Sequence, residues 1–177
     1  EYTPEHTTEP ALPPRRAYPS VKMVQKADLL SAAKSALVPQ KSGAKWPVVA
    51  DVPLSMEQIG QNYAFVLYDT EVKVTATKEI SFAPFPRDRA HVFINGTMAI
   101  AEPISRVDGN KTVPLTAASR SSHGNLQILV ENMGRINYGL GMTDHKGIEG
   151  KIAGEAVIVN GENVTGPDAW KMWSLPL

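Results

Sequence analysis

The amino-acid sequence predicts a mainly β protein, an antiparallel β-sandwich or jelly roll with one short N-terminal helix. Short apolar or alternating runs, typical of β-strands, follow one another from residue 63 onward. Asn-Gly pairs at 95–96 and 160–161 stand between such runs, and this dipeptide is the strongest short-range signal of a β-hairpin. Many short strands separated by turns are typical of a sandwich, whereas helical spacing of apolar residues occurs at one place near the N-terminus.

The composition is that of a globular chain with one domain of ordinary size and a short extension. Of its 177 residues, 42% are hydrophobic and 20% are charged. The net charge is zero, so there is no general reason to expect nucleic acid or an anionic membrane as a partner. No apolar run approaches the roughly 20 residues that a membrane-spanning helix requires. The absence of cysteine excludes disulfides, cysteine-zinc sites and thiol nucleophiles.

Two segments are expected before the sandwich. Residues 1–19 are predicted to be a proline-rich linker or tail, because five prolines stand there without any apolar period. Residues 20–53 are predicted to hold the helix, over 25–37, and an irregular connection. Pro39 ends that helix, since the residue before a proline avoids helical geometry. The chain begins with neither a signal peptide nor a methionine, so we expect a processed or excised piece.

The sandwich domain is expected over residues 54–177. Its predicted strands, all short and either apolar or alternating, are 63–68, 71–75, 79–82, 90–94, 97–100, 112–115, 126–131, 154–159 and 164–170. In the clearest of them, Leu126, Ile128 and Val130 alternate with mixed neighbours, which predicts a strand with one strongly buried face.

A shaped loop is predicted to follow this strand. Gly134 and Gly139 bound a short polar and aromatic segment, and glycine adopts backbone conformations that are closed to other residues. Arg135, Asn137 and Tyr138 would then project from a fixed platform as recognition groups. The alternative is that Arg135 and Asn137 satisfy buried loop carbonyls while Tyr138 fills a gap.

The residues by themselves predict no catalytic site. Glu131 and Asp144 flank the loop and form the carboxylate pair to consider for glycoside hydrolysis, but a strand-end charge and a turn group explain them better. His145 follows Asp144 directly, and adjacent residues of a strand point to opposite faces. The four histidines lack metal-ligand spacing, and neither a serine-nucleophile signature nor a phosphate-binding glycine loop is present. We therefore expect no catalytic residue, no metal and no cofactor in this chain.

Three Asn-x-Thr sequons predict N-linked glycosylation. They begin at Asn95, Asn110 and Asn163, and each lies in polar, turn-like surroundings where a glycan could be tolerated. Their number favours passage through the secretory pathway, with a lysosomal or extracellular destination.

Several blocks of sequence, in this order along the chain, resemble the first β-domain of the β-galactosidases of glycoside hydrolase family 35. The blocks are PLSME at 53–57, GQNYAFVLY at 60–68, DRAHVFING at 88–96, VENMGRINYG at 130–139, DHKGI at 144–148 and WKMWSLPL at 170–177. The similarity covers roughly residues 20–177.

Two positions depart from the family's pattern. Asp69 stands where the family commonly has arginine after the strand tyrosine, and Ala64 stands where glycine is usual. The reversed charge at Asp69 is expected to alter a contact with neighbouring domains.

The resemblance implies a non-catalytic β-domain of a glycoside hydrolase that acts on terminal β-galactosides. The family's catalytic part is a (β/α)₈ barrel with two glutamates, and such a barrel takes about 250 residues, so it cannot fit here. The barrel and a further β-domain, in the same protein or complex, are the expected partners. The chain would brace the barrel and shape the entrance of its sugar pocket.

Carried over to this loop, the resemblance makes Tyr138 a wall at that entrance, facing a galactoside, while Arg135 and Asn137 hold the loop's shape. An aromatic face suits the apolar side of a sugar ring, and a neighbouring amide suits its hydroxyls. Two alternatives stay open: a structural subunit of a larger assembly, and a free-standing carbohydrate-binding module.

Overall fold

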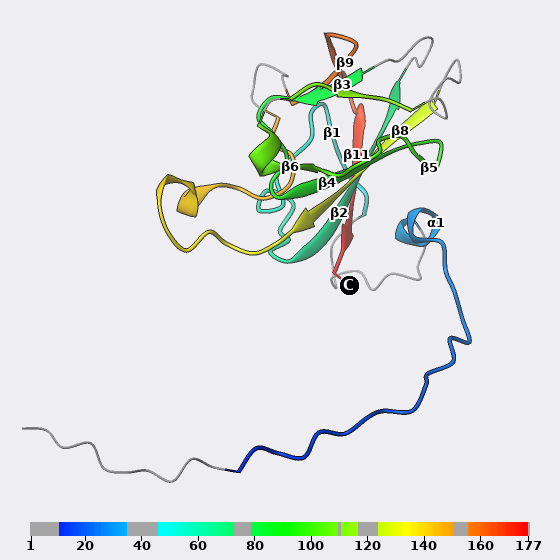
Figure 1. The fold of residues 1–177 in the computed structure, drawn as a ribbon. Coiled ribbons are helices and arrows are strands. Elements are labelled where there is room, and N and C mark those ends of the chain that lie inside the picture. The colour runs from blue at the N-terminus through cyan, green and yellow to red at the C-terminus, as the bar shows by residue number, and fades with distance from the viewer. Residues whose placement is uncertain are drawn as a thin grey trace, which may run out of the picture.

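The computed structural model describes residues 11–34, 46–72, 79–109, 111–116, 124–150 and 156–176. Within these residues the strands form two antiparallel sheets that pack face to face (Figure 1), which confirms the predicted mainly β sandwich with one short N-terminal helix. The helices and strands, in chain order, are α1 Leu29–Ala33, β1 Val48–Ala50, β2 Ala64–Val72, β3 Glu79–Phe82, β4 Arg89–Ile94, β5 Thr97–Met98, β6 Ile104–Ser105, the 3₁₀ helix η1 Arg106–Asp108, β7 Val113–Pro114, β8 Gly124–Asn132, the 3₁₀ helix η3 Leu140–Thr143, β9 Val157–Val159, β10 Glu162–Asn163 and β11 Trp170–Leu175.

The larger sheet is built around β2 and β8. In the described part of the chain it has seven strands in the order β1-β11-β2-β8-β4-β5, with β6 beside β4. The sequence predicted two strands where β2 runs without a break, and this prediction was wrong. Asp69 and Thr70, in the supposed gap, pair with Gln127 and Leu126 of β8, so the ladder continues through them.

The smaller sheet has the order β10-β9-β3-β7 within the described residues. Both predicted Asn-Gly hairpins are present, and Asn95, Gly96, Asn160 and Gly161 all have positive φ, as the tight hairpin turn requires. The second hairpin is shorter than predicted because its return strand is β10, at 162–163. The later part of the predicted strand, near Trp170, begins β11 in the other sheet, and β1 and β6 were not predicted.

The main core lies between the two sheets. Residues from the larger sheet, such as Val66 and Ile128, pack with Ile80, Phe82 and Val157 of the smaller sheet in one buried cluster. Alternate residues of each strand face this cluster, which is the pattern that a sandwich needs.

The outer face of the larger sheet is also buried at its centre, which corrects the expectation that one face of β8 would be buried. Leu67, Leu129, Trp173 and Leu175 form a second apolar cluster there, and Gln127 is buried as well. The cover comes from Leu29 and Leu30 of α1, which lies beside the larger sheet on the side turned away from β3 and β9 (Figure 1). Mixed polarity along β8 hid this second buried face.

The helix begins later than predicted. The carboxylate of Asp28 accepts a hydrogen bond from the backbone N–H of Ser31 at 2.8 Å, so Asp28 caps the helix and residues 25–28 precede it. Residues 35–37 and Pro39 lie outside the described residues. Residues 11–28 are exposed and contain neither helix nor strand. No helix within the described residues is long and apolar enough to cross a membrane.

Asp69 pairs with Lys34 at the end of α1. The carboxylate of Asp69 is buried, its ion pair with Lys34 lies on the outer face of the sheet, and the ammonium of Lys34 sits 5.2 Å from the centre of the Trp173 ring. The reversed charge at this position is therefore balanced inside the chain. The division at residue 53 stays a prediction, and β1, which lies before it, pairs with β11.

Candidate functional site

The predicted loop leaves β8 at one end of the sandwich. There Asn132 pairs with Ala64, whereas the other end of the same two strands carries the pair of Gly124 and Val72. In Figure 1 the loop is the yellow to gold segment that projects from the sandwich, with η3 near its tip. Residues 133–145 are called the loop below.

Arg135 closes the loop. Its guanidinium donates to the carboxylate of Glu57 at 2.6 Å and to the backbone carbonyl of Asp144 at 2.9 Å. The first contact ties the loop to the turn before β2, and the second ties it to the loop's own return. The Arg135 side chain is about half exposed, so its outer side stays open to solvent.

A buried ion pair holds both ends of the loop. The Nζ of Lys146 lies 2.7 and 2.8 Å from the two carboxylate oxygens of Asp88, and the two residues are 2% and 6% exposed. Asp88 also accepts a hydrogen bond from the backbone N–H of Met133 at 2.8 Å. The backbone N–H of Lys146 donates to Glu57 at 2.8 Å. Asp88 thus binds Met133 at the start of the loop and Lys146 just after its end, and Glu57 binds Lys146 as well.

Further ion pairs surround the return of the loop. The carboxylate of Asp144 lies 3.3 Å from Arg106 and 3.5 Å from Arg87, and Arg87 lies 3.6 Å from Glu149. The ring Nδ1 of His145 lies 2.8 Å from Glu149. Asp144 is thus engaged by two guanidinium groups. These ion pairs suit a structural role for Asp144 better than a role as general acid or base.

The other half of the carboxylate pair is also engaged. Glu131, at the end of β8, accepts a hydrogen bond from Nε of Arg89 at 2.9 Å, and the two residues face each other across β8 and β4. The ion pair of Glu131 and Arg89 therefore lies on the outer face of the sheet.

Just after the loop, the backbone at Gly147 and Ile148 packs against the side chain of Tyr68. The buried phenol of Tyr68 donates to the carbonyl of Leu54 at 2.9 Å and accepts from the N–H of Ile148 at 3.1 Å. Burial raises the pKa of Tyr68 well above its usual value, so the phenol stays neutral. Gly147 has a φ of +90°, and a Cβ there would lie 2.3 Å from the Tyr68 oxygen. Glycine is therefore required at this position for two reasons.

The tip of the loop is apolar and uncovered. Tyr138 is 88% exposed, Leu140 is fully exposed and Met142 is about half exposed. Met133, at the start of the loop, is also more than half exposed. Val107 of η1 is exposed beside Arg106, which reaches the loop through Asp144. Single exposed apolar residues are ordinary, but here several stand on one anchored loop.

Asn137 and Tyr138 contribute differently from Arg135. Both are exposed, and within the described residues no hydrogen bond joins either side chain to the rest of the domain. The structure thus brings Arg135 into the anchoring network and leaves the side chains of Asn137 and Tyr138 exposed.

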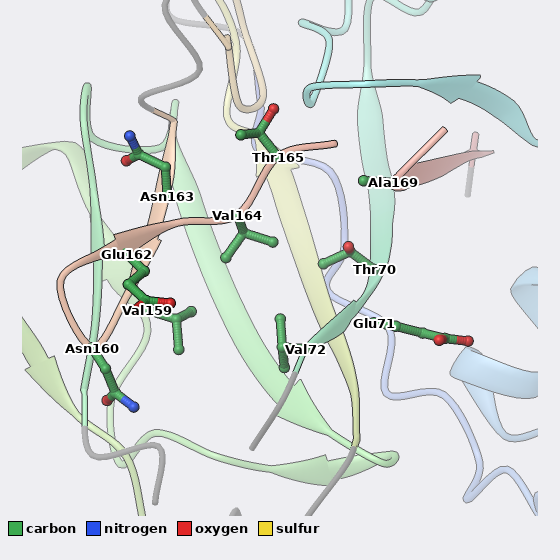
Figure 2. A pocket seen from close by; sticks show the side chains of 10 residues that line it. All are labelled: Thr70, Glu71, Val72, Val159, Asn160, Glu162, Asn163, Val164, Thr165 and Ala169. Atoms are coloured by element: carbon green, nitrogen blue, oxygen red, sulfur yellow. The ribbon is translucent and has the colours of Figure 1, made fainter. Parts of the chain in front are cut away.

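An open groove of about 550 Å³ lies at the opposite end of the sandwich (Figure 2). Its described lining residues are Thr70, Glu71, Val72, Val159, Asn160, Glu162, Asn163, Val164, Thr165 and Ala169, and none of these is aromatic or belongs to the loop. Because sugar sites usually stack a ring on an aromatic face, the groove does not resemble the predicted sugar entrance.

The sequons lie apart from the loop. Asn95 is exposed in the turn between β4 and β5, and Asn163 is exposed on β10. Asn110 lies outside the described residues.

The anchoring residues Glu57, Asp88, Arg106 and Lys146 were missed as site residues. They come from four separate segments, so no local pattern connects them. Three of them do stand in blocks that carry the family resemblance, at 53–57, 88–96 and 144–148, and this was the available signal.

Comparisons with known proteins agree on one group. A family described as "Beta-galactosidase, first all-beta domain" matches residues 53–176. The chain is 30% identical to Beta-galactosidase 17 of Arabidopsis thaliana, over 97% of the chain and 24% of that protein. It is 32% identical to a Beta-galactosidase of Macaca fascicularis, over 91% and 22%, and 35% identical to Beta-galactosidase 8 of Oryza sativa, over 72% and 19%. The chain therefore spans about a fifth to a quarter of these relatives.

Proposed function

Because the chain belongs to the β-galactosidase family, as its first all-β domain over residues 53–176, we propose that it braces a catalytic (β/α)₈ barrel and shapes the entrance to the barrel's sugar pocket. In this proposal the domain supplies no catalytic residue and takes no cofactor. The barrel, and a further β-domain, belong to the same protein or complex. The substrate is a terminal β-galactoside, hydrolysed by the barrel.

The observation that carries the proposal is the contrast between the loop's base and its tip. The base is held by the buried pair of Asp88 and Lys146 and by the contacts of Arg135. The tip exposes Tyr138 and Leu140 with nothing over them. A loop that is ordered before binding loses little conformational entropy when a partner covers it, so this arrangement favours tight docking.

Three residues have separate roles at the entrance. Tyr138 offers an aromatic face to the apolar side of the galactoside ring, and Asn137 offers an amide to its hydroxyl groups. Arg135 touches no sugar and positions the other two through Glu57 and the Asp144 carbonyl. Leu140 and Met142 pack against the barrel wall.

The test is steady-state kinetics of the β-galactosidase that contains this chain. Tyr138→Ala should raise KM for a galactoside several-fold while kcat changes less, because the residue contacts the substrate outside the reacting bond. Tyr18→Ala is the matched control, since Tyr18 is equally exposed but lies in the N-terminal segment. If both variants keep the KM of the unmodified enzyme, the entrance role is wrong.

The exposed tip also favours a second candidate, a structural subunit of a larger assembly that contains no galactoside pocket. Replacing Leu140 and Met142 together by serine should release the partner in both cases. Only the first candidate predicts that Tyr138→Ala changes KM. Saturable binding of a galactoside to the isolated chain, lost in Tyr138→Ala, would instead favour a free-standing carbohydrate-binding module.

A further inference from the structure

The outer face of the larger sheet is covered by α1 through a specific set of contacts. Leu29 and Leu30 pack on the second apolar cluster, and the ammonium of Lys34 pairs with the buried carboxylate of Asp69. The same ammonium lies over the ring of Trp173. The face therefore recognises a pair of leucines with a lysine four residues after the second.

The helix α1 holds its shape only while it is packed on the sheet. It has five residues, and an isolated helix shorter than about 12–15 residues is marginal in water. When α1 leaves the sheet, it uncovers four apolar side chains that are now at most 9% exposed: Leu67, Leu129, Trp173 and Leu175. Exposing these side chains to water is unfavourable, so an open face binds another copy of the helix whenever one is within reach.

Two open hollows border α1 on the surface of the domain. One, of about 390 Å³, lies between Lys34 and residues of β2 and β11, and the other, of about 330 Å³, lies between α1 and the turn from β4 to β5. On the N-terminal side of the helix, residues 11–28 are exposed and lead away from the sandwich (Figure 1). The helix can therefore leave the face by a local opening in which both sheets stay closed.

The chain that follows α1 is long enough to carry the helix to a second molecule. Residues 34–47 stand between the end of α1 and the start of β1. A stretch of this length spans roughly 50 Å at full extension, against about 30 Å for the diameter of a small domain. Because β1 is paired with β11, an exchange moves α1 and leaves the sandwich as it is.

We propose that α1 is an exchangeable helix, and that two copies of this chain associate by each placing its α1 on the outer face of the other's larger sheet. An exchanged helix makes the same contacts through Leu29, Leu30 and Lys34 that it makes within one chain. Exchange therefore costs mainly the independent motion of two molecules, and high protein concentration favours it. Because the contact is reciprocal, the assembly closes at two copies. The inference does not rest on the proposed function, since it involves neither the loop nor the barrel.

The absence of cysteine from the chain allows a direct test by cross-linking. Ser31 of α1 and Asn125 of β8 border the same hollow, so Ser31→Cys and Asn125→Cys are made as two single variants of the full chain and mixed. A short bis-maleimide should link residue 31 to residue 125, as read by mass spectrometry of the peptides. Each variant carries one cysteine, so this link forms only between two chains. Light scattering should show twice the 19.2 kDa mass of one chain, in a fraction that rises with concentration.

Two matched controls accompany the mixture. Glu71→Cys and Glu162→Cys measure chance collisions, because both residues line the groove of Figure 2 and both belong to the sandwich. Mixing these two variants should give at least tenfold less cross-link than the mixture that joins residues 31 and 125. In the Ser31→Cys chain, Leu29→Ser with Leu30→Ser should abolish the link, whereas Leu12→Ser with Val21→Ser, in the exposed segment before α1, should keep it.

Three results would each overturn the proposal. The first is the mass of a single chain at every concentration. The second is equal cross-linking in the two mixtures, which would assign the link to collisions. The third is a dimer that persists after Leu29→Ser with Leu30→Ser, which would assign the association to another surface of the domain.

Discussion

The ammonium of Lys146 contacts both carboxylate oxygens of Asp88, at 2.7 and 2.8 Å, and both side chains are buried. Asp88 stands just before β4, and Lys146 directly follows the loop, so the pair joins segments far apart in sequence. Because Asp88 also accepts from Met133, one carboxylate fixes the exit from β8 and the return of the chain.

Removing the cation should be costly. In Lys146→Met the carboxylate of Asp88 stays buried without its main partner, and breaking a buried pair typically costs about 3–5 kcal/mol of unfolding free energy. Chemical denaturation measures this loss. Lys171→Met is the control, because Lys171 is exposed on β11, and it should change stability by less than about 0.5 kcal/mol. Equal stability of the two variants would show that the buried pair is not a main support.

Gly147→Ala should destabilise the domain far more than the same change at Gly161, which has a similar positive φ but space for a side chain. The new methyl would lie 2.3 Å from the Tyr68 oxygen, so overpacking, about 1–3 kcal/mol, adds to the roughly 1–2 kcal/mol of left-handed strain. Gly161→Ala isolates the strain, since φ is +81° there and no atom lies within 4 Å of the added Cβ. A thermal melt compares the two, and indistinguishable midpoints would contradict the close approach at Tyr68.

Ala64→Gly should stabilise the domain. Ala64 has a φ of +62°, which costs an L-residue roughly 1–2 kcal/mol, and glycine removes that strain while losing up to about 1 kcal/mol through greater freedom of the unfolded chain. The net gain expected in denaturant unfolding is about 0.5–1 kcal/mol. Ala50→Gly in β1, where φ is negative, should destabilise instead. A loss of stability in Ala64→Gly would show that the positive φ is not strained.

His91 should make the domain less stable in acid. Burial, followed by the nearby Arg89, lowers the pKa of His91, while Glu131 opposes this shift. Below about pH 6.5 the unfolded chain therefore binds a proton that the folded chain resists, so stability falls as the pH drops toward the lowered pKa. His91→Gln should flatten this part of the curve of unfolding free energy against pH. An unchanged slope would assign the acid sensitivity to other groups.

Asp69→Arg, which restores the charge usual in the family, should loosen α1. It would place a cation beside Lys34 and remove the pair that holds the helix end over Trp173. Hydrogen exchange of residues 29–34 should speed up by about tenfold, while exchange in the centre of β8 stays slow. Asp168→Arg, at an exposed position on the same side, is the control. Equal protection of α1 in both variants would show that the helix is held by Leu29 and Leu30 alone.

The sequence predicted the fold class, most strands of the sandwich, both hairpin turns and the position of the loop. These depend on local patterns: alternation along a strand and the positive φ that Asn-Gly accepts. It missed the second buried face of β8, because Gln127 and Glu131 share that face with Leu129 and weaken the apolar signal. What covers a sheet face depends on packing between distant segments.

The anchoring of the loop could not be predicted for the same reason. Glu57, Asp88 and Lys146 meet only when the turn before β2, the start of β4 and the end of the loop are brought together. Taken singly, each reads as an ordinary surface charge. The identity of Arg135 as an anchoring group likewise depended on where Glu57 lies.

Asp88 and Lys146 close the loop much as a disulfide would in a chain that contained cysteine, but with side chains that need no oxidant. The exposed side chains of Asn137, Tyr138, Leu140 and Met142 take no part in this closure. Changes at these four side chains therefore leave the buried pair intact, whereas Gly141 between them has no room for a side chain beside Arg106 and Asp144. The tip is the part of the domain where new specificity can evolve, by substitution or insertion, at little expense to folding.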